Sequence, residues 1–157
     1  IAATCSFAVS TQTGPDAVCL AFRQPVCYID VSRFSQFFFG TKLAWWNPTE
    51  LWQTGSRLSL RDVLTGPVGN IKDPNDFIKY GVTQVRSDSA MITKLVAGFA
   101  ESFEKQFVQS ESDEVVEHSV QRSIEELMGF DGRQQFGRIT AVLNPAFVRQ
   151  SGDWYLV

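Results

Sequence analysis

The chain has 157 residues, of which 44% are hydrophobic and 20% charged, and it carries a formal net charge of −3 at pH 7. These values fit one globular domain over residues 1–157 and exclude a largely disordered chain. The 14 basic residues are scattered singly among 17 acidic ones, which argues against a nucleic-acid-binding protein with a basic face. No apolar run approaches the ~20 residues that span a bilayer, so only peripheral membrane contact stays open.

The first 31 residues predict a β-rich beginning. A strand is expected within 4–11, before the turn signal Gly14-Pro15. Residues 17–22 and 26–31 are both rich in apolar and β-branched side chains and are separated by a short connection. Together they predict a β-hairpin.

All three cysteines, Cys5, Cys19 and Cys27, lie in this part of the chain. They lack the Cys-x-x-Cys spacing of a zinc or redox site, so buried free thiols are the favoured interpretation. The alternative is a disulfide between Cys19 and Cys27, because a hairpin would bring these two residues to adjacent cross-strand positions.

The chain begins with Ile1 instead of a methionine. This start predicts either a processed chain, which has lost an exported or organellar leader, or a trimmed one. The sequence leaves the compartment unassigned.

Residues 34–52 hold seven aromatic side chains in nineteen residues. Within this block Trp45 and Trp46 are adjacent and must point to different sides in any regular element. We therefore expect one indole in the core and the other exposed. Because aromatic side chains dominate interface hot spots, the block supplies the candidate partner- or ligand-binding residues. These candidates are Phe37, Phe38, Phe39, Trp45, Trp46 and Trp52.

The middle of the chain predicts short elements between turns. Pro48 suits the first position of a short helix, and 57–64 alternates well enough for a strand. Residues 65–76 are rich in Gly, Pro, Asn and Asp and predict the longest surface loop. Asp73 is expected to cap a short helix over 74–81.

Two amphipathic helices, about 88–109 and 112–128, are the clearest predicted elements, and Ser87 or Asp88 is the expected N-cap of the first. Strands at 138–143 and 154–157 follow. Strands, then two helices, then strands again indicate an α+β fold, with an antiparallel sheet and both helices packed on one face. The stripe expected to be buried on the first helix contains Met91, Leu95, Phe99, Phe103 and Phe107.

The chain shows no pattern typical of catalysis. His118, the only histidine, falls among charged residues on the second helix and is expected to be solvated, which excludes histidine triads and multi-histidine metal sites. Asp62, Asp73 and Asp76 fit turn and capping roles and lack the spacing of a calcium loop. We therefore predict no catalytic residue, no metal site and no cofactor.

These observations favour a non-enzymatic protein-interaction module, a subunit or accessory factor of a larger assembly that docks through an aromatic surface. The alternative is a protein that binds a small hydrophobic ligand in an apolar cavity between helices and sheet. An enzyme built on carboxylates and a serine or tyrosine is a third, weaker option. No motif resembles a known family, and the expected partner is a protein.

Overall fold

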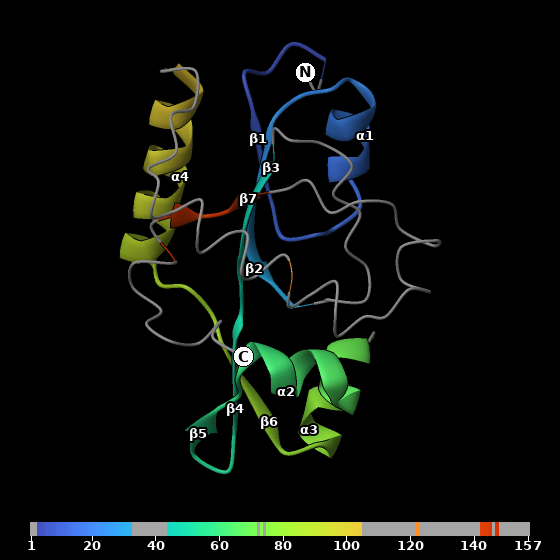
Figure 1. Ribbon diagram of the computed structural model, residues 1–157. Helices are drawn as coiled ribbons and strands as arrows, with labels where there is room; N and C mark the ends of the chain where they lie inside the picture. Colours follow the sequence, from blue (N-terminus) through green and yellow to red (C-terminus); the bar gives the residue numbers. More distant parts are fainter. Residues whose placement is uncertain are drawn as a thin grey trace.

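The described part of the chain mixes helices with one parallel and one antiparallel sheet (Figure 1). The computed structural model describes residues 3–32, 44–71, 73, 75–104, 122, 142–145 and 147. This confirms a mixed α+β protein, but the larger sheet is parallel and not antiparallel. In chain order the elements are β1 (Ala8–Ser10), α1 (Asp16–Ala21), β2 (Val26–Val31), β3 (Ala44–Pro48), β4 (Glu50–Gln53), β5 (Ser56–Arg57), α2 (Leu60–Thr65), the 3-10 helix η2 (Pro67–Asn70), α3 (Asp76–Lys79), β6 (Val82–Val85), α4 (Ser89–Glu104) and β7 (Val142–Leu143).

The parallel sheet has the strand order β1-β2-β3-β7. Every neighbouring pair runs parallel, and β2 and β3 occupy the middle. Nearly every residue of these two strands is buried. Such continuous burial is typical of parallel strands, because helices cover both faces of their sheet.

The predicted hairpin of 17–22 and 26–31 is wrong in its first half. Only the second segment is a strand; the first is α1, which begins directly after Pro15 with Asp16 in its first turn. Proline and an acidic residue at these places favour a helix start. Burial and the nearby Asp16 carboxylate raise the pKa of the Tyr28 hydroxyl, so the start of α1 lies close to β2. The connection through α1 returns the chain to the end of the sheet at which β1 begins. β2 therefore runs parallel to β1.

The sheet is covered on both faces, by α4 on one side and α1 on the other (Figure 1). Trp45 faces α4, where its ring meets that of Phe99 edge-on at 5.5 Å between centroids. Trp46 faces the other way and packs in the larger core cluster with Tyr28. The two indoles are only 7% and 2% exposed. The adjacent side chains do diverge, but the expected exposure of one indole is wrong, since each face has a helix over it.

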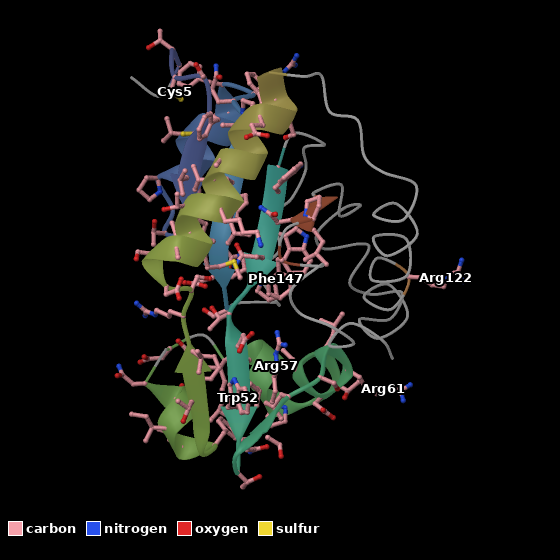
Figure 2. All side chains as sticks on the ribbon, turned by 90° about the vertical axis from the view of Figure 1, so that its left-hand side faces the viewer. Cys5, Trp52, Arg57, Arg61, Arg122 and Phe147 are labelled. Carbon is pink, nitrogen blue, oxygen red and sulfur yellow. The ribbon has the colours of Figure 1, made fainter. Side chains whose placement is uncertain are left out.

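A second, antiparallel sheet with the order β5-β4-β6 follows without a break in direction, because β3 runs on through Thr49 into β4. Leu51 and Val82, on one face of this sheet, join the larger core cluster. The helices α2 and α3 lie beside it (Figure 1). Figure 2 shows Trp52 and Arg57 at this end of the molecule and Cys5 at the opposite end.

Two short elements differ from the expectation. Pro48 ends β3 instead of opening a helix, which suits a residue that has no N–H for a sheet. The strand expected over 57–64 is confined to Arg57, the last residue of β5, because Ser59 and Asp62 form a capping box that starts α2 at Leu60. The Asp62 N–H donates to Ser59 Oγ at 3.1 Å, and the Ser59 N–H donates to Asp62 Oδ2 at 3.0 Å.

Two of the remaining predicted elements are found, and others fall on residues that are not described. The short helix expected over 74–81 is α3, ahead of which Asp73 accepts a hydrogen bond from the Asn75 N–H at 2.9 Å. The strand expected over 138–143 is represented by β7. Several predicted features lie outside the described residues. They are Phe107, His118, the segment 154–157 and all of the predicted helix 112–128 except Arg122.

The predicted helix 88–109 is confirmed over α4, and Asp88 caps it by accepting the Met91 N–H at 2.7 Å. Leu95 and Phe99 are buried as expected, whereas Phe103 is 44% exposed. The buried stripe therefore does not extend to Phe103.

We expect Phe99→Ala to lower the free energy of unfolding by about 3–5 kcal/mol, because it empties a space between Phe7 and Trp45. Phe103→Ala should cost less than about 2 kcal/mol, since much of that ring already meets water. Urea unfolding of both variants measures the difference. Equal losses would contradict the assignment of Phe99 to the core.

The capping box of α2 predicts acid sensitivity. Hydrogen bonds from Ser59 lower the pKa of Asp62. A depressed pKa in the folded state stabilises the protein above the unfolded pKa of about 3.9, and this contribution is lost as the pH falls through the folded value. Ser59→Ala should thus cost about 0.5–2 kcal/mol at pH 7 and less near pH 2. A cost that is independent of pH would show that the carboxylate is not involved.

Candidate functional site

A pocket of about 360 Å³ lies where β2 and β3 end and α4 begins. We call it the carboxyl-edge pocket, because parallel strands end together at one edge of their sheet. In open parallel sheets ligands bind outside the carboxyl ends of the strands. The polar side chains that line it and matter below are Asp30, Glu50, Ser87, Asp88 and Lys94, and its apolar wall includes Met91 and Phe147.

A β-bulge places Asp30 at this edge. Tyr28 pairs with Trp46, and Val31 pairs with Pro48. Between these two pairs β2 therefore contains one residue more than β3. Val31 consequently shares the core with Tyr28 instead of facing the other side. Asp30 has a φ of 52°, a left-handed conformation that aspartate tolerates better than most residues. Bulges often re-aim a side chain in this way.

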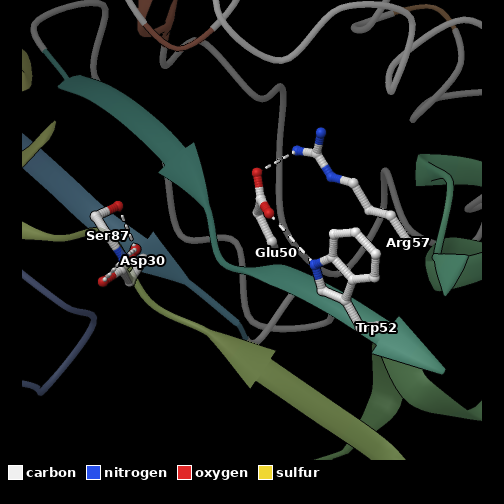
Figure 3. A network of polar contacts seen from close by, with 5 residues as sticks. All are labelled: Asp30, Glu50, Trp52, Arg57 and Ser87. Carbon is white, nitrogen blue, oxygen red and sulfur yellow. Dashed lines mark hydrogen bonds and ion pairs between the residues drawn. The ribbon is translucent and has the colours of Figure 1, made fainter. Parts of the chain in front are cut away.

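Ser87 holds the Asp30 carboxylate in place (Figure 3). The Ser87 hydroxyl donates to Asp30 Oδ1 at 2.7 Å, and the Ser87 N–H lies 3.1 and 3.2 Å from the two carboxylate oxygens. These contacts join residues 57 positions apart and tie the end of β2 to the start of α4. Within the described residues no cation forms an ion pair with Asp30.

Glu50 is held differently. Its Oε1 lies 3.0 Å from Arg57 Nη2, and its Oε2 accepts a hydrogen bond from Trp52 Nε1 at 3.3 Å (Figure 3). Burial lowers the pKa of Arg57, and the nearby Glu50 opposes that shift. An arginine nevertheless stays charged at neutral pH, so Glu50 is a paired carboxylate, whereas Asp30 has no ion-pair partner among the residues that the structure describes.

The start of α4 completes the pocket. Asp88 already serves as the cap of the helix, and Lys94 brings an ammonium group from the next turn. Met91 and the buried Phe147 add apolar surface. The pocket thus offers the Asp30 carboxylate, which no described cation pairs, the cationic side chains of Lys94 and Arg86, and an apolar wall. This lining suits a small molecule with charged groups of both signs.

Asn47 lies on β3 opposite the bulge, and its side chain is 1% exposed. Neither its amide oxygen nor its amide nitrogen has a hydrogen-bond partner within the described part of the chain. An unsatisfied buried polar group costs about 1–3 kcal/mol. The carboxyl edge of β2 and β3 therefore carries both a left-handed aspartate and a buried amide that no described residue satisfies.

The three aromatic candidates that the structure describes do not line the pocket. Trp45 and Trp46 are core residues, and Trp52 is half-buried on the small sheet, where it contacts Glu50. Phe37, Phe38 and Phe39 lie outside the described residues, and a binding role for the block stays a prediction. The pocket residues were missed, although a charged Asp30 inside an otherwise apolar strand was a usable signal.

No family model matches the chain, and no match is found among curated proteins or among solved structures. Within the described ranges, no three or more His, Cys, Asp and Glu side chains are grouped so that they could hold a metal ion. None of the helices described here combines the length and the apolar character needed to cross a bilayer. The assignment of function therefore rests on the pocket itself.

Three substitutions at position 30 should separate backbone strain from hydrogen bonding. Asp30→Asn keeps an acceptor for Ser87 and tolerates a positive φ, so it should cost less than about 1 kcal/mol of stability. Asp30→Ala loses both properties and should cost about 2–4 kcal/mol. Asp30→Gly should fall between them. Thermal unfolding measures the order, and an alanine variant as stable as the asparagine variant would contradict this role of Asp30.

Proposed function

We propose that the protein binds a small zwitterionic ligand in the carboxyl-edge pocket, with the cationic group of the ligand toward Asp30 and its acidic group toward Lys94. The observation that carries this proposal is the bulge that aims Asp30 at the carboxyl ends of two parallel strands. This carboxylate has no ion-pair partner in the part of the chain that the structure describes. The volume of about 360 Å³ falls within the range of about 300–1,000 Å³ that is usual for small-molecule sites.

The geometry of the carboxylate supports this proposal. Because Ser87 already fixes the Asp30 oxygens, little side-chain entropy is lost when a ligand arrives. The Glu50 carboxylate contributes less attraction, since Arg57 neutralises it. This function modifies the ligand-binding alternative drawn from the sequence: the pocket lies at the edge of the sheet, and its lining is partly polar instead of wholly apolar.

Docking of a protein partner through aromatic residues is the second candidate, as expected of a subunit or accessory factor. Strand pairing places Trp52 and Val85 on the same face of the small sheet, and Val85 is 44% exposed. A partner-binding surface there would make Trp52→Ala fold normally but lose its native assembly on co-purification. We also keep as a proposal that a helix over 112–128 packs on the α4 face, which its apolar periodicity supports.

Binding of zwitterions can be measured by titrating the ¹⁵N-labelled protein with a panel of amino acids, and with a diamine and a dicarboxylate as single-sign probes. We expect amino acids to shift the amide signals of Asp30, Ser87 and Lys94, and Asp30→Asn to weaken binding by about 10-fold or more, as for a lost charged contact. The matched control is Asp73→Asn, which changes an exposed turn carboxylate. No binding by any amino acid, or binding unaffected by Asp30→Asn, would refute the proposal.

A further inference from the structure

Cys5 lies at the end of the molecule remote from Trp52 and Arg57 (Figure 2), and Cys19 lies near it. Cys5 precedes β1, and Cys19 belongs to α1. Both residues are partly exposed, and Cys5 lies close enough to Cys19 to contribute, after desolvation, to the raised pKa of the Cys19 thiol. Cys27, in contrast, is fully buried in β2, where burial raises the pKa of its thiol to about 12. The three cysteines therefore divide into an adjacent, accessible pair and one inert thiol.

Gln24 independently holds the two segments together. Its backbone N–H donates to the carbonyl oxygen of Cys19 at 2.9 Å, and its side-chain amide donates to the carbonyl oxygen of Ala3 at 3.3 Å. One residue thus contacts the cysteine-bearing turn of α1 and the chain two residues before Cys5. The Ala8 N–H, which donates to the Pro25 carbonyl oxygen at 2.9 Å, fixes the same segment beside β2.

We propose that Cys5 and Cys19 are a modification site: a low-molecular-weight disulfide such as oxidised glutathione converts them into a protein disulfide that ties the N-terminal segment to α1. One cysteine thiolate attacks the oxidant, forms a mixed disulfide and releases one glutathione thiol. The other cysteine thiolate then attacks the protein sulfur of that mixed disulfide and releases the second. Two protein thiols are oxidised, one glutathione disulfide is reduced, and the two protons end on the released thiols.

Two properties follow from the surroundings of the pair. Desolvation, together with the neighbouring Cys5, raises the pKa of Cys19, so the exchange should be faster at alkaline than at neutral pH. The bond would close a loop of about 15 residues, which restricts the unfolded chain and stabilises the folded one. For a chain of this length the melting temperature should rise by about 5–10 °C.

Tryptic mapping tests the proposal sharply, because Arg23 is the first basic residue of the chain. Cys5 and Cys19 both fall in the peptide 1–23, and Cys27 falls in the next. After the full chain is treated with oxidised glutathione and alkylated, we expect peptide 1–23 to be lighter by two hydrogens and to take up no alkylating agent. Cys27 should remain alkylatable after unfolding, and it serves as the internal control.

Cys5→Ser and Cys19→Ser, each at a partly exposed position, should both lose the oxidant-dependent rise in melting temperature. Either variant suffices if the other folds poorly. Peptide 1–23 that keeps two alkylatable thiols after oxidation would overturn the proposal. A disulfide that joins peptide 1–23 to the Cys27 peptide, or one that joins two chains, would overturn it as well.

Discussion

Strands β2 and β3 lie side by side in the middle of the parallel sheet, and the apolar side chains on both of their faces must be kept from water. This requirement determines where the flanking helices go: α4 covers the face with Trp45, and α1 lies over the face with Trp46. Large aromatic rings on both faces stabilise the pair strongly, since each buries roughly 150–250 Å². The outer strands β1 and β7 pair with the two edges of this buried central pair.

The carboxyl-edge pocket is a consequence of how this pair ends. An extra residue in β2 would turn the following side chain to the wrong face, and the left-handed Asp30 absorbs it so that Val31 returns to the core. β3 meanwhile continues into β4 and brings Glu50 to the same edge. The connection from β6 to α4 supplies Ser87, which fixes Asp30. Three separate segments of the chain therefore meet at one site.

Local patterns predicted β2, the start of α4 at Asp88 and the mixed fold class, because each depends on neighbouring residues. α1 was missed because the six apolar residues 17–22 fit a strand and a helix equally well. Only Pro15 and Asp16, at its start, favour the helix. α2 was missed because the capping box of Ser59 was overlooked. The burial of both indoles and the Asp30–Ser87 contact depend on residues far apart in the chain, which no local pattern encodes.

Residue-resolved amide hydrogen exchange tests most directly whether the β2–β3 pair is the stable centre of the molecule. If it is, the slowest amides belong to β2 and β3 and exchange only through global unfolding, with a free energy equal to that from urea unfolding. The amides of α1, which has no buried residue, and of the small sheet should exchange earlier through local opening. Exchange of β2 and β3 as fast as that of α1 would contradict the account.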